Sequence, residues 1–372
     1  MLNTLKIGLI GAGNAVHAHL AGFAELSISV AGICDLIPEK AESVAAQYGI
    51  ARVYPHAGAL IEAVEFVGVI TPPDSHAELV IQALRADKDV TCEKPMGNNL
   101  SECDLMVEAE TASDGRLFIV QNRAYTDAMK AMRKMIADGA VGTVLCIKSE
   151  GLEGEELLNR MPSIRTDERG VIGTQAEHQT YMGPLLVGSD IASVNINTHK
   201  RPDTNMLAPD GTADGTFTYA NGVRHLLFHT LERGSLPSEH NLEIIGTEGK
   251  LRSFRTGPQN RRIEVLQWQR ANSQIWENVD LTDARVRSRE FAAMWADYLN
   301  AALTGSEPMM TTEMARRSIH IVDKMYESAA LGGAPTAIAL PSAPQAQPGG
   351  RKLGLRPKFL RKLGPSGPNL RQ

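Results

Sequence analysis

Cysteine is scarce in this sequence of 372 residues, and long hydrophobic runs are missing. The four cysteines lie in separate segments without paired spacing, which argues against a disulfide framework and favours reduced thiols in the cytoplasm. No hydrophobic run approaches the roughly 20 residues that cross a bilayer. The N-terminus also lacks the basic segment, apolar stretch and cleavage site of a signal peptide. We therefore expect a cytoplasmic protein that binds neither membrane nor nucleic acid.

Acidic residues are missing from the C-terminal end of the chain. Residues 341–372 contain seven lysines and arginines and no aspartate or glutamate, although the net charge of the whole chain is −5. The segment is rich in proline and glycine and repeats Arg-Lys-Leu-Gly at 351–354 and 361–364, a composition that does not form a packed core. We expect residues 334–372 to be a disordered basic tail. A solvated extension is favoured over an electrostatic arm for an anionic partner.

The first third of the chain alternates strand patterns with helix patterns, which is typical of a parallel sheet wound by crossover helices. The expected strands are Leu5–Ile10, Ser29–Asp35, Glu65–Ile70, Asp89–Cys92 and Leu117–Gln121. The expected helices cover residues 14–26, 38–48, 75–86 and 100–113. Residues 1–122 are therefore predicted to form a Rossmann domain, an α/β fold with a doubly wound parallel sheet.

The chain beyond residue 122 predicts a second domain of the α+β class, covering residues 123–333. A helix near 126–138 and the strand Thr143–Ser149 are followed by many strand patterns without helices between them, at 191–198, 212–220, 223–230, 241–246, 250–254 and 262–268. Strands joined by short turns imply a mainly antiparallel open sheet. Helices are expected near 286–303 and 311–331. One face of such a sheet can be buried against another subunit, so we expect a homo-oligomer, a dimer or a tetramer.

The first strand leads into the turn Gly11-Ala12-Gly13-Asn14-Ala15, directly before a helix. Gly11 permits a tight turn, and Gly13 lets the backbone approach a pyrophosphate on the positive end of the helix. Asp35 follows Gly13 by 22 residues, at the end of the second strand, where its carboxylate can accept hydrogen bonds from the adenosine ribose. This carboxylate repels a 2′-phosphate and no arginine follows it, so NAD is favoured over NADP.

Lys94 lies in Glu93-Lys94-Pro95, directly after the fourth strand. A lysine at the carboxyl end of a parallel strand points into the crevice where open α/β sheets bind ligands. Cys92 abuts this lysine, and a buried strand cysteine is favoured over a nucleophile.

Several motifs together resemble the glucose-fructose oxidoreductase, inositol dehydrogenase and rhizopine-catabolism protein family. The resemblance extends from Lys6 to about Leu331 and rests on Gly-Ala-Gly with His19, Thr71-Pro72 with His76, Cys92-Glu93-Lys94-Pro95, Asn122-Arg123 and Gly246-Thr247-Glu248-Gly249. It implies a nicotinamide-dependent oxidoreductase acting on the carbinol or carbonyl of a sugar, an inositol or a sugar derivative. It also implies that residues 170–188 form a catalytic helix, and that the turn at Thr71 and Pro72 lies near the nicotinamide ribose. Asn14, Ala15, His76 and Glu93 join the expected cofactor-binding residues.

The family's catalytic signature Asp-x-Gly-x-His aligns with Thr174 to His178. The histidine is present, but Thr174 replaces the aspartate, and a hydroxyl can only hydrogen-bond where a carboxylate would also support an imidazolium. The resemblance implies that His178 takes the proton of the substrate hydroxyl while Lys94 stabilises the oxyanion. Thr174 is a candidate substrate-binding residue.

Other polar residues remain open to two interpretations each. Arg123 either reaches the substrate or pairs with a carboxylate. Arg165, flanked by Arg160 and Arg169, either docks an anionic substrate group or is a solvated loop residue. His225 and His229 share a strand-like run, and structural or substrate-facing roles are favoured over zinc. We expect no metal site.

Three functions are compatible with these residues. The leading prediction is an NAD-dependent dehydrogenase or reductase of a cyclic polyol, sugar or sugar derivative. The missing aspartate makes a reductase of a non-sugar carbonyl or imine a credible second. The third is a nucleotide-binding sensor or assembly protein without catalysis. The substrate and the direction of the reaction are not readable from the sequence.

Overall fold

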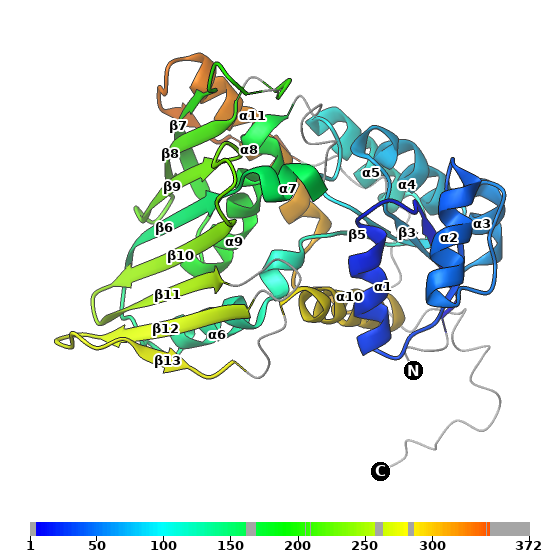
Figure 1. The fold of residues 1–372 in the computed structure, drawn as a ribbon, viewed down its shortest axis with the longest axis horizontal. Coiled ribbons are helices and arrows are strands. Elements are labelled where there is room, and N and C mark those ends of the chain that lie inside the picture. Colours follow the sequence, from blue (N-terminus) through cyan, green and yellow to red (C-terminus); the bar gives the residue numbers. More distant parts are fainter. Residues whose placement is uncertain are drawn as a thin grey trace, which may run out of the picture. The chain divides into compact units, whose positions relative to one another are not determined.

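The computed structural model describes residues 5–160, 169–204, 206–208, 210–256, 263–281, 286–339 and 341–342. The chain divides into two compact units (Figure 1). The first contains the chain up to Val120 together with Phe291–Glu313, and the second contains Gln121–Glu290 and Met314–Pro341. Each unit is built on its own sheet.

The first unit contains a five-stranded parallel sheet. Its strands are β1 (Ile7–Ile10), β2 (Val30–Cys34), β3 (Phe66–Val69), β4 (Asp89–Cys92) and β5 (Leu117–Ile119). Their order in the sheet is β2-β1-β3-β4-β5, and each neighbouring pair is parallel. The strands consist mostly of buried hydrophobic residues, because both faces of a parallel sheet are covered by crossover helices. The predicted Rossmann fold is confirmed.

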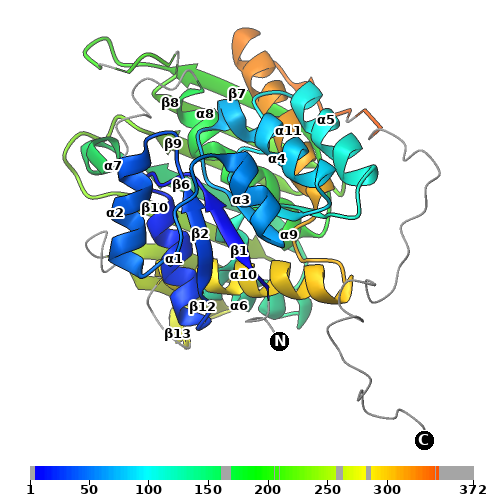
Figure 2. The same ribbon diagram turned by 90° about the vertical axis from the view of Figure 1, so that its right-hand side faces the viewer.

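The crossover helices are α1 (Val16–Glu25), α2 (Pro38–Tyr48), α3 (Ala57–Ala63), α4 (His76–Arg85) and α5 (Leu100–Thr111). Figure 2 shows α3, α4 and α5 beside one another, and α4 contacts both of its neighbours. The short helix α3 was not predicted from the sequence. It begins at His56, whose ring nitrogen accepts the Ala59 N–H, a cap that the usual set of Ser, Thr, Asp and Asn does not include.

The helix α10 (Val286–Thr304) corrects the expected domain division. We expected the whole segment 123–333 to form the second domain, but Phe291–Glu313 belongs to the first unit. Trp295 and Tyr298 are fully buried there, with ring centroids 5.6 Å from Phe66 and 5.1 Å from Phe118 respectively. The helix returns to the parallel sheet because burying two large aromatic side chains against its strands contributes several kcal/mol.

The second unit contains a nine-stranded sheet. Its order is β13-β12-β11-β10-β6-β9-β8-β7-β14, and every neighbouring pair except β6 and β9 is antiparallel. The strands are β6 (Val144–Leu152), β7 (Ile191–His199), β8 (Thr212–Tyr219), β9 (Arg224–Thr230), β10 (Glu239–Gly246), β11 (Gly249–Thr256), β12 (Ile263–Arg270), β13 (Glu277–Val279) and β14 (Thr336–Ala337). The mainly antiparallel sheet is confirmed, whereas β13 and β14 were not predicted.

Helices cover one face of this sheet (Figure 1). They include η3 (Asn122–Tyr125), α6 (Asp127–Ala137), α8 (Gly170–Thr174), η5 (Ala176–His178), α9 (Gln179–Val187) and α11 (Thr312–Ala330); the short α7 (Glu155–Arg160) follows β6. The expected catalytic helix over residues 170–188 is not continuous, because the helical path breaks at Gln175. Within the preceding turn, the Thr174 hydroxyl donates to the Gly170 carbonyl at 2.5 Å, a bond that bends helices.

The boundary of the C-terminal tail also differs from the expectation. Thr336 and Ala337 pair with Val194 and Ser193 of β7, so the chain beyond residue 333 still belongs to the sheet. The Pro341 carbonyl accepts a hydrogen bond from Arg316 at 3.0 Å. The basic repeats at 351–354 and 361–364 lie outside the described residues.

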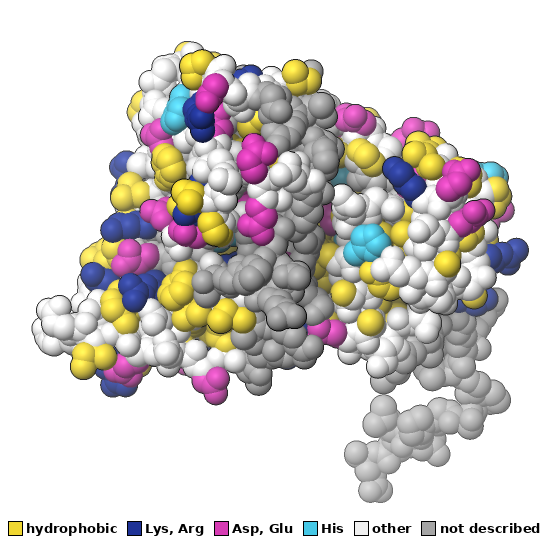
Figure 3. Space-filling view, viewed as in Figure 1, with side chains coloured by type: hydrophobic (Ala, Val, Ile, Leu, Met, Phe, Trp, Pro, Cys, Tyr) yellow, Lys and Arg dark blue, Asp and Glu magenta, His cyan; other side chains and the backbone are white. Residues whose placement is uncertain are grey.

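The other face of the second sheet carries exposed side chains. Leu226 and Phe228 are 43% and 42% exposed, and Lys148 and Glu150 lie opposite them on β6. Figure 3 shows hydrophobic and charged side chains interspersed over the second unit in that view. The homo-oligomer expected through an open sheet face stays a prediction. Among the described residues, no helix combines the length and the hydrophobicity needed to cross a membrane.

Candidate functional site

The glycine turn after β1 has the geometry expected of a dinucleotide-binding turn. Gly11 has a φ of +103°, and a Cβ at this position would lie 2.4 Å from the Ile70 carbonyl oxygen, so only glycine fits. At Gly13 a Cβ would meet no atom within 4 Å, which leaves the backbone open to an approaching group. Asn14 is exposed, and Ala15 precedes α1 without a side-chain cap. The positive end of α1 is thus available to a phosphate.

Asp35 lies beside this turn at the end of β2. Its Oδ2 accepts the Ala12 N–H at 2.7 Å, and its Oδ1 accepts the Ile37 N–H at 2.9 Å. The two hydrogen bonds hold the carboxylate at the carboxyl edge of the sheet, where the sequence predicted a ribose-binding group. The residues here fit a dinucleotide.

Lys94 follows β4 and is half-buried. Its backbone N–H donates to Glu93 Oε2 at 2.9 Å, while the other oxygen, Oε1, lies 2.9 Å from His19 Nε2. Trp295 Nε1–H donates to His19 Nδ1 at 3.1 Å. Because Nδ1 accepts, Nε2 must carry the hydrogen and donate it to Glu93. Burial alone would raise the pKa of Glu93, but the hydrogen bond from His19 and the charge of Lys94 lower it.

In this histidine relay from Trp295 to Glu93, each carboxylate oxygen of Glu93 accepts a hydrogen bond inside the first unit. The bond from the Lys94 N–H fixes the backbone at the start of the lysine side chain. The expected contact of Glu93 with the cofactor stays a prediction. His19 is fully buried and braces α1 against the turn after β4.

His76 links two turns at the carboxyl edge of the sheet. Its Nδ1 lies 2.8 Å from the Pro95 carbonyl oxygen and its Nε2 lies 2.9 Å from that of Thr71. The ring is fully buried and braces the two turns, and the expected cofactor contact by His76 stays a prediction. Thr71 and Pro72 remain accessible at the end of β3. Cys92 is fully buried, and burial raises the pKa of its thiol well above the ordinary value, which fits the favoured structural role.

His178 lies in η5 of the second unit and is only 4% exposed. Its Nδ1 lies 2.6 Å from the Tyr181 hydroxyl, one helical turn later. Tyr181 is itself buried and is an electrostatic neighbour of Arg123. The Thr174 hydroxyl donates its proton to the Gly170 carbonyl. The Tyr181 hydroxyl is in place to orient the His178 imidazole.

Arg123 forms a second histidine relay. It donates to His240 Nδ1 and to Gln175 Oε1, each at 3.2 Å. His240 Nε2 then donates to Glu153 Oε1 at 2.6 Å. Burial and the charge of Arg123 lower the pKa of His240 to about 4. The hydrogen bond to Glu153 raises this pKa, but by less than the charge of Arg123 lowers it. The sequence left open whether Arg123 pairs with a carboxylate, and its hydrogen bonds to described residues are to neutral side chains.

The remaining histidines of β9 are buried inside the sheet. His225 lies between Ser149 and Tyr219, 2.8 Å and 3.2 Å away, and burial lowers its pKa to about 3. Within the described residues, no group of three His, Cys, Asp or Glu side chains is arranged to hold a metal ion. Arg165 lies outside the described residues.

The sequence did not point to Trp295, Tyr181, His240 or Glu153. Tyr181 had a usable signal, because residues three apart on a helix are neighbours. His240 and Glu153 are 87 residues apart, and neither stood in a recognised motif.

Profile comparisons place both halves of the chain in one family. Residues 5–121 match the oxidoreductase family with an NAD-binding Rossmann fold, and residues 129–252 match the GFO/IDH/MocA C-terminal domain. The inositol 2-dehydrogenase of Rhizobium meliloti is 31% identical over 257 residues, covering 66% of this chain and 74% of that protein. The D-apiose dehydrogenase of Rhizobium rhizogenes is 25% identical over 348 residues, covering 89% and 97%.

Solved structures share the fold over nearly the whole chain. An oxidoreductase from Agrobacterium radiobacter in complex with NAD+, L-tartaric acid and magnesium has a TM-score of 0.79 at 22% identity, covering 90% of this chain and 98% of that one. Levoglucosan dehydrogenase in complex with NADH and levoglucosan has a TM-score of 0.78 at 23% identity, covering 92% and 100%. With the glycine turn, the parallel sheet and the mainly antiparallel second sheet, these matches show that the chain belongs to the GFO/IDH/MocA family of NAD-binding oxidoreductases.

Proposed function

We propose that the chain is an NAD-dependent dehydrogenase of a sugar, an inositol or a sugar derivative, with Lys94 polarising the substrate oxygen and His178 as the acid/base. The observation that carries the proposal lies in the first unit. Gly11, Asp35, Thr71 and Lys94 follow β1, β2, β3 and β4 in turn, so the dinucleotide turn and the lysine share one edge of one parallel sheet. This is the edge at which open α/β sheets bind ligands.

When bound, the nicotinamide accepts or returns a hydride at the reacting carbon. Lys94 stabilises the negative charge that develops on the substrate oxygen, a contribution that reaches roughly 3–4 kcal/mol for a well-placed donor. The hydrogen bond from the Lys94 backbone to Glu93 holds the start of this side chain in place. In the reductive direction the same ammonium polarises the carbonyl.

His178 takes the hydroxyl proton in the oxidative direction and returns it in the reductive direction. If Nδ1–H donates to the Tyr181 oxygen, the lone pair on Nε2 is directed away from Tyr181 and can accept a proton. A tyrosine hydroxyl stabilises the resulting imidazolium less than a carboxylate would, because it carries no charge.

The substrate class is drawn from the relatives. Their names identify dehydrogenases of D-apiose and of inositol, and a structural neighbour binds levoglucosan. All three compounds carry several hydroxyl groups. A second candidate, a reductase of a non-sugar carbonyl or imine, is favoured only by Thr174, whose hydroxyl is committed to the backbone where family members carry an aspartate.

The test is to replace Lys94 and His178 by alanine in separate variants. The purified proteins are incubated with NAD+ and a panel of sugars, inositols, sugar acids and sugar phosphates, and separately with NADH and a panel of non-sugar carbonyls and imines, while the absorbance of NADH is followed. We expect turnover to fall by at least ~10²-fold in each variant, with binding of NAD retained. Lys130→Ala and His199→Ala, at exposed positions, are matched controls and should keep full activity.

Full turnover in Lys94→Ala or in His178→Ala contradicts the assigned role of that residue. Turnover of carbonyls or imines without any turnover of sugars or inositols supports the second candidate. NAD binding without turnover on any panel supports a nucleotide-binding sensor or assembly protein.

A further inference from the structure

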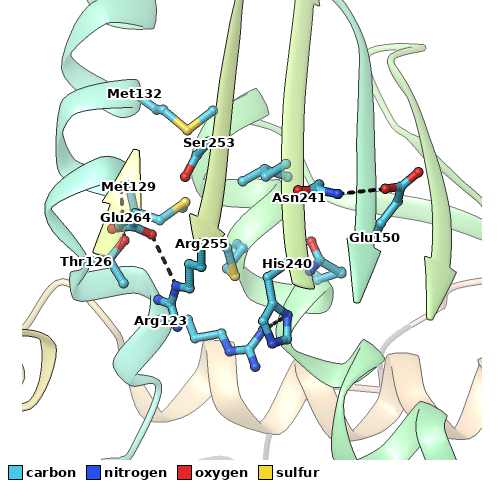
Figure 4. Close-up of a pocket in the computed structure, with 13 residues that line it drawn as sticks. Arg123, Thr126, Met129, Met132, Glu150, His240, Asn241, Ser253, Arg255 and Glu264 are labelled. Atoms are coloured by element: carbon cyan, nitrogen blue, oxygen red, sulfur yellow. Dashed lines mark hydrogen bonds and ion pairs between the residues drawn. The ribbon is translucent and has the colours of Figure 1, made fainter. Parts of the chain in front are cut away.

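The helix-covered face of the second sheet contains a polar cavity that the catalytic proposal does not use. Its volume is about 40 Å³, enough for roughly three water-sized groups. Arg123 and Thr126 line it from η3 and the start of α6, Gln179 from α9, and His240, Ser253, Arg255 and Glu264 from the strands (Figure 4). All of these residues belong to the second unit.

Two arginines line the cavity, and their charges are compensated differently. Arg255 lies 3.4 Å from Glu264 and 3.1 Å from Glu290, which neutralise it. No carboxylate of the described residues lies within ion-pair distance of Arg123, whose hydrogen bonds go to the neutral acceptors of His240 and Gln175. Burial lowers the pKa of Arg123 to about 10, and the charge of Arg255 adds to the effect. At neutral pH Arg123 is therefore a partly buried cation without a direct counterion.

The acidic residues of the cavity wall are already engaged. Glu150 accepts a hydrogen bond from Asn241 at 2.9 Å, and Glu264 pairs with Arg255 and accepts the Ala128 N–H. Neither forms an ion pair with Arg123, and Glu153 and Glu290 act on it only through longer-range electrostatics. The Arg123 guanidinium can therefore still bind a negative group in the cavity.

Gln179 gives an independent indication of a ligand. The side chain is only 5% exposed, and within the described part of the chain its Oε1 has no hydrogen-bond partner. A buried amide oxygen without a donor costs about 1–3 kcal/mol, so a bound hydroxyl that donates to it would be stabilised. Gln179 follows His178 directly, and Gln175, which accepts from Arg123, precedes it by three residues. The cavity therefore adjoins the segment that carries the proposed acid/base.

We propose that this cavity recognises an anionic group of the substrate, with Arg123 binding a carboxylate or a phosphate and Gln179 accepting a hydrogen bond from a neighbouring hydroxyl. The substrate class is then a sugar acid or a sugar phosphate, not a neutral polyol; naming this group the substrate rests on the proposed function. Arg123 forms the charged contact, because a guanidinium offers a bidentate fork to either oxyanion.

Isothermal titration of the full chain at low ionic strength tests this directly, with D-gluconate, D-glucose 6-phosphate and D-glucose as probes. We expect at least one of the two anions to bind at least ~10-fold more tightly than D-glucose, and the stronger of the two identifies carboxylate or phosphate. Arg123→Leu should remove this preference, and Arg123→Lys should retain part of it. Arg252→Leu is the matched control: this arginine of β11 lies outside the cavity, over the Trp276 ring, and its loss should leave the preference intact.

Binding of D-glucose as tight as that of both anions overturns the proposal, and so does an unchanged preference in Arg123→Leu. If Arg123→Leu fails to fold, Gln179→Leu replaces it, and an unchanged affinity for both anions in that variant likewise overturns the proposal. Because titration needs no turnover, a chain that binds the anions but oxidises nothing refutes the proposed function and leaves the anion site supported.

Discussion

The two units each contain a histidine held between a donor and a glutamate, and the donors differ in charge. In the first unit the neutral Trp295 N–H donates to His19, which donates to Glu93. In the second unit the cation of Arg123 donates to His240, which donates to Glu153. The hydrogen-bond pattern is the same, Nδ1 accepting and Nε2–H donating. An indole selects a tautomer by geometry alone, whereas a guanidinium also opposes protonation of the ring through its charge.

This difference predicts that the two glutamates matter for different reasons. Glu93 offers two acceptor oxygens to two N–H donors, and a glutamine would present an amide N–H to one of them. Glu153 offers the negative charge that acts on the buried Arg123.

The largest expected effect is that of Glu153→Gln. The substitution replaces the charged acceptor of a buried hydrogen bond from His240 and removes a charge that acts on Arg123, which should cost roughly 1.5–3 kcal/mol of unfolding free energy. Glu93→Gln should cost only about 1–2 kcal/mol, the value of one lost buried hydrogen bond. Urea unfolding of both variants measures the two costs. Glu243→Gln is the control: Glu243 lies 3.8 Å from Lys148 in a surface ion pair, so its loss should change the unfolding free energy by about zero. An equal cost for Glu153→Gln and Glu93→Gln would remove the distinction between the relays.

The second prediction concerns pH and His240. Its pKa is about 4 in the folded protein and ~6.5 when unfolded, so between these values the unfolded chain binds the extra proton. Stability is therefore lost as the pH falls from ~6.5 towards 4, by up to about 3 kcal/mol from this residue. His240→Gln should be less stable than the parent at pH 7 but should lose less stability on acidification.

Urea midpoints measured between pH 7 and pH 4.5 test the slope. His240→Gln should keep a residual dependence of stability on pH, because burial also lowers the pKa of His225 and His229. His199→Gln, at an exposed position, serves as the control with the parent slope. A slope in His240→Gln as steep as that of the parent contradicts the effect of burial and of Arg123 on this ring.

The third prediction concerns Trp295→Phe. The substitution removes the N–H that His19 Nδ1 accepts and part of a fully buried ring, which should cost about 2 kcal/mol. In the control, Trp268→Phe removes a partly buried N–H that donates to the Ala140 carbonyl at 3.2 Å, and should cost about 1 kcal/mol. Urea unfolding compares them, and a greater cost for Trp268→Phe would show that the neutral relay contributes little.

The relays also show how far prediction from the sequence extends. His19 and Glu93 both stood in recognised motifs of the Rossmann domain, but the hydrogen bond between α1 and the turn after β4 was not predicted. His240 and Glu153 lie on β10 and just beyond β6, which pair only because a sheet order of β10-β6-β9 forms. Trp295 is 276 residues from His19, and no sequence pattern in its helix indicated which of the two sheets the helix would cover.

The sequence by itself determined what short-range chemistry controls: the glycine turn, the strands that end at Asp35 and Lys94, the parallel first sheet and the strand-rich second one. These depend on periodicity and on backbone conformation, which neighbouring residues specify. Only the tertiary structure decided that Phe291–Glu313 returns to the first unit, that the segment with His178 breaks at Gln175, and that Arg123 donates to His240 and Gln175. Burial and pairing between distant residues set these features, because they depend on which surfaces exclude water together.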